Sequence, residues 1–92
     1  MKIYKSQEEI EADIKDGVLT VNEDVKFEIS FKISAALKIA GNIDAGNIDA
    51  GNINFFALAF AYISFKCKSI KGRRENAKYG CLDSEVIIEN NV

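Results

Sequence analysis

Three near-copies of one pentapeptide stand back to back in this chain: A-G-N-I-D from Ala40, A-G-N-I-D from Ala45 and A-G-N-I-N from Ala50. On an α-helix a step of five residues turns about 500°, so successive isoleucines would drift by about 140° and never share a face. On a regular strand they would alternate between two sides. We therefore expect a backbone that turns a corner about every five residues and buries all three isoleucines, as a β-solenoid does.

The composition suits a single small domain spanning residues 1–92, because 48% of the 92 residues are hydrophobic and 28% are charged. The chain has no His and no Trp, which leaves little material for acid–base catalysis or a metal site. We expect no catalytic residues, no metal and no cofactor. The longest apolar run, 55–63, is too short to span a bilayer, so we expect a soluble, intracellular protein. Cys67 and Cys81 should be free thiols rather than a disulfide.

Near the N-terminus, Ser6 and Glu9 have the spacing of a capping box, and Ile10 and Ile14 lie on one helical face. This pattern predicts a short helix from about residue 7 to 16, closed by Gly17, within an N-terminal segment 6–17. A solenoid leaves its first coil with exposed apolar contents, so we expect the helix to cap that end. The alternative is a surface helix that is not packed on the solenoid.

Residues 25–34 alternate strictly between apolar and polar side chains, which predicts a half-buried strand. The shorter apolar stretch 18–21 should form a preceding strand of the same sheet, joined to this one by a turn at 22–24. The two strands together would form the first coil. The coils should continue to residue 70. Residues 71–92 should form a basic loop and a closing strand at 86–88 that covers the far end.

The five-residue rhythm predicts five successive inward positions, namely Ile43, Ile48, Ile53, Leu58 and Ile63. In the second half, phenylalanines replace the alanines of the repeat. Either the rings fill a wider part of the core, which is the commoner arrangement, or they cover a face that meets another chain. In the second case the chain is a homodimer, and the candidate interface contains Phe55, Phe56, Phe60, Tyr62 and Phe65.

Charge is segregated along the chain, because residues 66–78 hold six of the 12 Lys and Arg and one acid, for a charge of +5. The remainder carries −7, which returns the net −2. This segment could bind phosphates or an acidic partner surface, or it could be a solvated face neutralised by the acidic body. The candidate partner-binding residues are Lys68, Lys71, Arg73, Arg74, Lys78 and Tyr79.

The polar residues of the repeat are better explained by structure than by chemistry. Asp44 and Asp49 should lie on successive faces of a coil and point in different directions, which argues against a paired catalytic site. Asn42, Asn47 and Asn52 should mostly bond the backbone at turns rather than contact a partner.

Residues 40–82, with I-D-A-G-N-I-D-A-G-N-I-N followed by F-A-Y-I-S-F-K-C-K-S-I-K-G-R-R-E-N, resemble small pentapeptide-repeat-like β-helix proteins of phages and prophages of Gram-positive bacteria. The resemblance implies an all-β fold, a short right-handed β-solenoid with a small N-terminal capping helix. Ordinary members of that class use coils of about twenty residues, which would stack Ile33 under Ile53 and Ile43 under Ile63.

The resemblance implies a mobile-element origin, and some pentapeptide-repeat proteins imitate DNA and occupy a DNA-binding enzyme. We therefore expect a phage-encoded inhibitory binding protein in the bacterial cytoplasm that docks on a host defence complex, of the anti-CRISPR or anti-restriction type. The alternatives are a structural, self-assembling β-helix and a nucleic-acid-binding accessory protein. The net acidic charge disfavours the last of these, and we expect no membrane partner.

Overall fold

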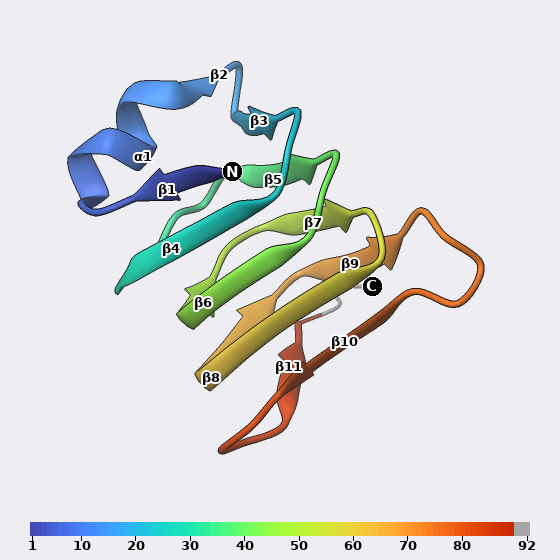
Figure 1. Cartoon of the computed structure of the whole chain (residues 1–92). Coiled ribbons are helices and arrows are strands. Elements are labelled where there is room, and N and C mark those ends of the chain that lie inside the picture. Colours follow the sequence, from blue (N-terminus) through green and yellow to red (C-terminus); the bar gives the residue numbers. More distant parts are fainter. Residues whose placement is uncertain (90–92) are drawn as a thin grey trace.

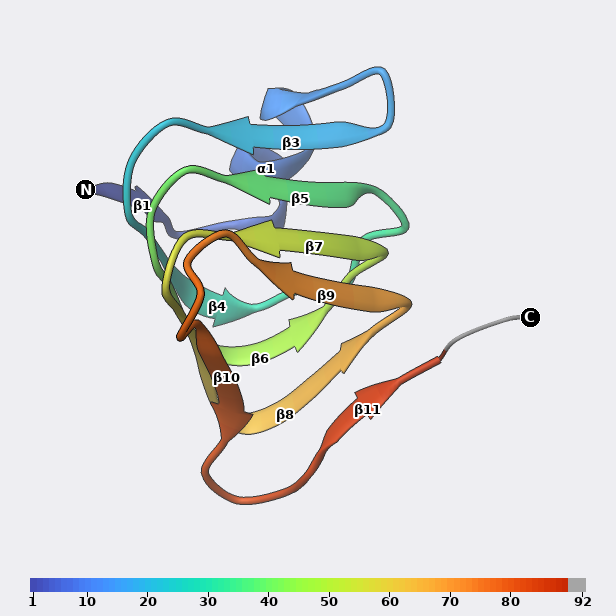
Figure 2. The ribbon, with the colours of Figure 1, turned by 90° about the vertical axis from the view of Figure 1, so that its right-hand side faces the viewer.

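The chain forms a β-solenoid of stacked coils built from two sheets (Figures 1 and 2). The structure is a computed structural model that describes residues 1–89. The first sheet contains β1 (Lys2–Tyr4), β4 (Val25–Ser30), β6 (Ile43–Asp49), β8 (Leu58–Cys67), β10 (Lys78–Cys81) and β11 (Val86–Ile88). The second contains β2 (Ile14–Lys15), β3 (Val18–Val21), β5 (Ala36–Ile39), β7 (Asn52–Phe55) and β9 (Ser69–Gly72).

The chain crosses from one sheet to the other at every turn, so equivalent strands of successive coils pair in parallel. Leu37 is paired with Ile53, and Ile53 with Ile70, so a coil takes 16 and then 17 residues. The expected solenoid is confirmed, but its coils are shorter than twenty residues. Ile43 stacks on Ala59 rather than on Ile63, because two sheets with two corners need fewer residues than four short faces.

The repeated isoleucines converge on one interior, as predicted, with exposed fractions of 2% for Ile43, 0% for Ile48 and 1% for Ile53. Their five-residue spacing combines two kinds of step. One is the ordinary two-residue step of a strand, from Ile43 to Ala45 and from Ile48 to Ala50, all buried. The other is a three-residue step. It falls at a register shift after Ala45 in β6, and again at the corner between Ala50 and Ile53.

The rhythm ends sooner than the sequence predicts. Leu58 and Ile63 are exposed, at 46% and 56%, so these two inward assignments were wrong. The corner after Phe55 takes four residues to reach the next inward position, Ala59, instead of three. The extra residue changes which side chains of β8 face the core. The inward residues of β8 are Ala59, Ala61, Phe65 and Cys67.

The N-terminal helix α1 (Gln7–Asp13) begins where predicted, and the Ser6 hydroxyl accepts a hydrogen bond from the Glu9 amide at 3.2 Å. It lies over the first coil at the N-terminal end of the solenoid (Figure 1), and Ile10 is fully buried there. The helix ends three residues earlier than predicted. The next residues form β2, which turns at Asp16 and Gly17, both with positive φ, and pairs antiparallel with β3.

The first coil contains the two predicted strands, β3 and β4, but they belong to different sheets. The turn at 22–24 is therefore a corner of the solenoid rather than a hairpin. Below α1, the Tyr4, Phe27 and Phe31 rings stack at centroid distances of 5.4 and 4.2 Å. Burial, with a 2.7 Å hydrogen bond from its hydroxyl to Asp13, raises the pKa of Tyr4 above its ordinary value.

The coils continue beyond residue 70, because β9, β10 and β11 extend both sheets. The predicted strand at 86–88 exists as β11. It lies parallel to the second half of β8 and in line with β10, and so does not cross the end of the solenoid as a lid would. The last three residues of the predicted C-terminal segment, 90–92, lie outside the described residues.

Candidate functional site: a cationic groove

One row of outward side chains crosses the whole second sheet. Thr20 pairs with Lys38, Lys38 with Asn54, and Asn54 with Lys71, so the four residues lie side by side on four successive coils. Their sequence neighbours Leu19, Leu37 and Ile53 point inward and are buried. Since side chains alternate along a strand, this buried row fixes the four polar side chains on the outer face.

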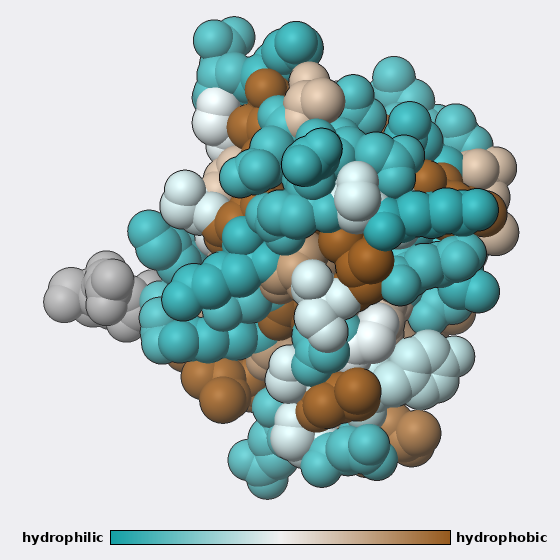
Figure 3. Space-filling view, turned by 90° about the vertical axis from the view of Figure 1, so that its left-hand side faces the viewer, coloured by the Kyte–Doolittle hydropathy of each residue, from teal (hydrophilic) through white to brown (hydrophobic). Residues whose placement is uncertain are grey.

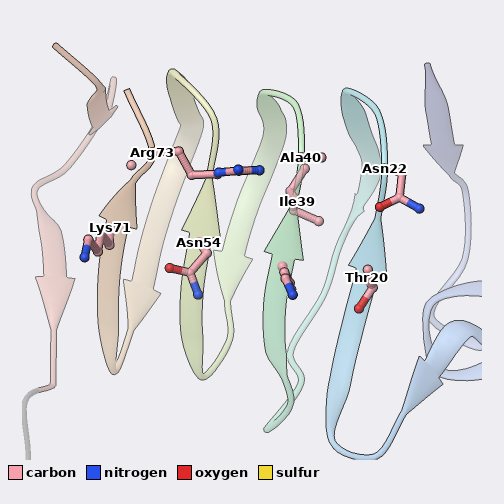
Figure 4. A pocket seen from close by; sticks show the side chains of 9 residues that line it. Thr20, Asn22, Ile39, Ala40, Asn54, Lys71 and Arg73 are labelled. Atoms are coloured by element: carbon pink, nitrogen blue, oxygen red, sulfur yellow. The ribbon is translucent and has the colours of Figure 1, made fainter. Parts of the chain in front are cut away.

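The loop after β9 adds a third cation to this row. The Arg73 amide donates to the Phe55 carbonyl at 2.9 Å, and the Arg74 amide donates to the Phe56 carbonyl at 3.0 Å. Gly72 packs against the Ala77 and Phe55 side chains, with no room for a Cβ atom. These contacts hold the loop on the preceding coil. Figure 4 shows Arg73 reaching across that coil toward Ala40.

The row and the loop enclose a groove of about 520 Å³ on the outer face of the second sheet. Its lining contains three cations and no carboxylate, and the strands β3, β5, β7 and β9 contain no Asp or Glu. The complete lining is Thr20, Asn22, Lys38, Ile39, Ala40, Asn54, Lys71, Gly72 and Arg73.

The groove cations have no carboxylate partner within residues 1–89. The ion pairs there join the N-terminus to Glu23, Lys2 to Asp13 and Lys66 to Glu89. The last of these, a 2.9 Å contact, raises the pKa of Lys66. Three unneutralised cations on one rigid face attract an anion, with a reach of about 8 Å at physiological salt. Their chemistry matches carboxylates or phosphates.

The predicted partner-binding residues divide into separate groups. Lys71 and Arg73 share the groove, while the Arg74 guanidinium lies over the Phe56 ring at 5.7 Å. Lys68 follows β8 at the other corner, and its amide donates to the Gly51 carbonyl. Lys78 and Tyr79 belong to β10 in the first sheet, where the Tyr79 ring contacts Phe55 and Phe65 at 6.3 and 6.4 Å.

The sequence did not point to Lys38, Thr20 or Asn54 as part of a site. They reach the groove because parallel strands of successive coils pair in register, although Thr20, Lys38 and Asn54 precede Lys71 by 51, 33 and 17 residues. The signal that could have found them is the coil length of 16 to 18 residues, which the five-residue rhythm does not reveal.

The candidate aromatic interface also divides. Phe55 and Phe65 are buried, at 0% and 1% exposure, so they belong to the core and are not available to another chain. Phe56, Phe60 and Tyr62 are exposed. The core alternative therefore holds for Phe55 and Phe65, and the interface alternative stays a prediction for Phe56, Phe60 and Tyr62. Figure 3 shows brown apolar side chains interrupting the hydrophilic surface near the C-terminal end of the solenoid.

The polar residues of the repeat have mainly structural contacts. The Asn42 side chain accepts hydrogen bonds from the Ala57 and Leu58 amides. Asn47 bridges the Ser30 and Ser64 hydroxyls at 2.6 Å each, and Asn52 accepts from Ser69 at 2.8 Å. Asp44 and Asp49 lie on one strand, β6, and not on successive faces as expected.

Cys67 and Cys81 are free thiols, as predicted, and burial raises the pKa of Cys67. Within residues 1–89 no cluster of three or more His, Cys, Asp and Glu side chains could hold a metal ion. The one helix of this part of the chain is too short to cross a bilayer.

No family model, curated protein or solved structure matches the chain, so its fold is established from strand pairing alone.

Proposed function

We propose that this chain is a non-enzymatic binding protein whose cationic groove docks on an acidic surface of a partner protein. Within that class we propose a phage-encoded inhibitor of a host defence complex, of the anti-CRISPR or anti-restriction type. Inhibition by occupancy needs a stable surface and one strong recognition feature, and it needs no catalytic group. The observation that carries the proposal is the groove itself, with Lys38, Lys71 and Arg73 and no carboxylate in its lining.

The groove is well suited to binding because the backbone that carries its side chains is held in place. Lys38, Asn54 and Lys71 stand on strands paired in register, and the Arg73 backbone is tied to the coil below. A surface that is ordered before binding loses less conformational entropy on association. Arg73 can also contact a carboxylate through two parallel hydrogen bonds, which adds orientation to attraction.

A protein partner fits the charges better than a nucleic acid does. DNA-binding proteins with strong electrostatic affinity make about 6–10 phosphate contacts, and the groove offers three cations. The chain carries a net charge of −2. The outer face of the first sheet has mixed charge, because Asp44 and Asp49 are paired there with Lys26 and Lys66. A long polyanion would therefore find no continuous cationic surface beyond the groove.

The test compares two triple variants in bacteria that carry a CRISPR or restriction system and are challenged with phage. The groove variant is Lys38→Ala, Lys71→Ala and Arg73→Ala. The control, Lys5→Ala, Lys26→Ala and Lys32→Ala, removes the same charge at positions outside the groove and outside the predicted partner-binding set. We expect the parent protein and the control to raise phage plating, and the groove variant to lose at least tenfold of that effect.

Three results would count against the proposal. If the parent protein relieves no defence system, the inhibitor assignment fails. If both triple variants lose activity equally, the groove is not the contact surface. If the purified protein binds a 20-base-pair duplex with an affinity that falls by orders of magnitude between 50 and 200 mM salt, the nucleic-acid alternative replaces the protein partner.

The second candidate is a structural, self-assembling β-helix. The observation that favours it is the C-terminal end of the solenoid, where β9, β10 and β11 are each paired on one side only within residues 1–89. Sedimentation would then detect large species rather than a monomer or a single small oligomer.

A further inference from the structure

The C-terminal end of the solenoid presents the apolar inward positions of its last coil without a cover. Ile70 pairs with Ile53, Tyr79 with Ala59, and Ile88 with Cys67. The members on the earlier coils are 0–1% exposed, whereas Tyr79 and Ile88 are 43% and 42% exposed. The same kind of position is buried in one coil and open in the next, because within residues 1–89 no further coil stacks on it.

The strands at this end also have unused pairing capacity. Within residues 1–89, β9 is the last strand of the second sheet, while β10 and β11 together are the last of the first sheet. Edge strands present unpaired N–H and C=O groups that readily bind another strand. Along the inward positions of the last coil no side chain is charged, so no buried charge would oppose such pairing.

Charged residues do flank this end, and opposite signs are separated. The segment 71–78 contains Lys71, Arg73, Arg74, Lys78 and Glu75, for a charge of +3, while Asp83 and Glu85 give the turn between β10 and β11 a charge of −2. In Figure 1 the loop from β9 to β10 and the turn from β10 to β11 lie on opposite sides of the C-terminal end. Neither segment forms an ion pair within residues 1–89.

We propose that two copies of this chain dimerise end to end through their C-terminal coils about a twofold axis. If this axis runs along the viewing direction of Figure 1, it exchanges the left and right sides of the C-terminal end. The basic loop of each copy then faces the acidic turn of the other. The same rotation reverses strand direction, and the edge strands pair antiparallel with their own copies. Charge complementarity therefore selects a second copy of the chain as the occupant.

The assembly closes at two copies because the apolar interior at the other end of the solenoid is covered, although β1 and β2 there are also edge strands. Helix α1 lies over the first coil there, with Ile10 buried beneath it. Head-to-tail stacking would need that end to be open, and only head-to-tail contacts generate filaments. The basic loop of this dimer contains two of the groove cations, Lys71 and Arg73, but the dimer does not require the proposed docking function and would stand if that function were wrong.

The first test measures molar mass by sedimentation equilibrium between 1 and 300 µM. We expect a monomer–dimer equilibrium for the parent protein. Ile88→Glu should raise the dissociation constant at least tenfold, because it places a charge in the interface. The matched control is Ile3→Glu, since Ile3 is also exposed and lies on β1 at the other end of the first sheet, and it should dimerise like the parent. Circular dichroism checks that each variant is folded.

The second test uses charge reversal. The variant Arg74→Glu with Lys78→Glu and the variant Asp83→Lys with Glu85→Lys should each be monomeric, because like charges then face each other across the twofold axis. Mixing them should restore a dimer, since each basic segment again meets an acidic one. A monomer at 300 µM for the parent, loss of dimer only in the Ile3 variant, or no dimer in the mixture would overturn the proposal.

Discussion

Three glycines in the same A-G-N-I context have three different environments, and this difference cannot be read from the residues alone. A Cβ atom on Gly41 would overlap the Asp24 backbone, and one on Gly51 would lie 2.9 Å from the Ser34 carbonyl oxygen. A Cβ atom on Gly46 would meet nothing within 4 Å. The repeat predicts the inward isoleucines correctly, but it does not say which glycine meets a neighbouring coil, because that depends on coil length.

The contrast between Gly41 and Gly46 gives a matched pair of substitutions. We expect Gly41→Ala to lower the free energy of unfolding by about 2 kcal/mol, because the corner must move away from Asp24. That movement would also weaken the 2.8 Å hydrogen bond from the Asn42 amide to the Asp24 carboxylate. Gly46→Ala should change stability by less than about 0.5 kcal/mol. Urea unfolding of both variants measures the difference, and equal stabilities would contradict the packing described for Gly41.

At the scale of elements, the sequence predicted what local rules determine and missed what pairing determines. The helix start was correct, since Ser6 and Glu9 are local signals. Its end was wrong because Ile14 and Lys15 pair with β3, and no local pattern announces that pairing. Likewise the strand at 18–21 was predicted correctly, and the strand predicted at 25–34 begins at Val25 but ends at Ser30. The division of these two strands between two sheets was not predicted. In the groove, Lys71 and Arg73 were predicted from the local cluster of basic residues. Lys38 was not predicted, because its place beside them depends on how the strands pair.

The helix cap permits a test of how much α1 contributes to the fold. The Ser6 hydroxyl satisfies the Glu9 amide, and the Glu9 carboxylate accepts the Lys5 amide at 3.0 Å. We expect Ser6→Ala to lower the free energy of unfolding by about 1 kcal/mol. Glu11→Ala, at an exposed position of the same helix, should have little effect. Thermal unfolding of both variants tests this, and a Ser6 variant as stable as the parent would mean that the cap is not coupled to the core.

At the scale of the whole molecule, the solenoid should be most stable in its middle coils. β6 is paired on both sides, with β4 and β8, and its inward residues are fully buried. β10 and β11 each pair only with β8 within residues 1–89, and their own inward residues Tyr79 and Ile88 are partly exposed. Since each coil contacts only its neighbours, terminal coils of such an array open at lower free energy than central ones.

Amide hydrogen exchange can resolve this gradient and link it to assembly. In dilute protein we expect amides of β6 and β8 to exchange slowest, and those of β10 and β11 to exchange at least tenfold faster. At a concentration that populates the dimer, protection should rise in β9, β10 and β11 and stay unchanged in β3 and β5. Uniform protection in dilute protein would contradict the coil-by-coil picture. A rise in β3 and β5 instead would place self-association on the face of the second sheet, where the groove lies.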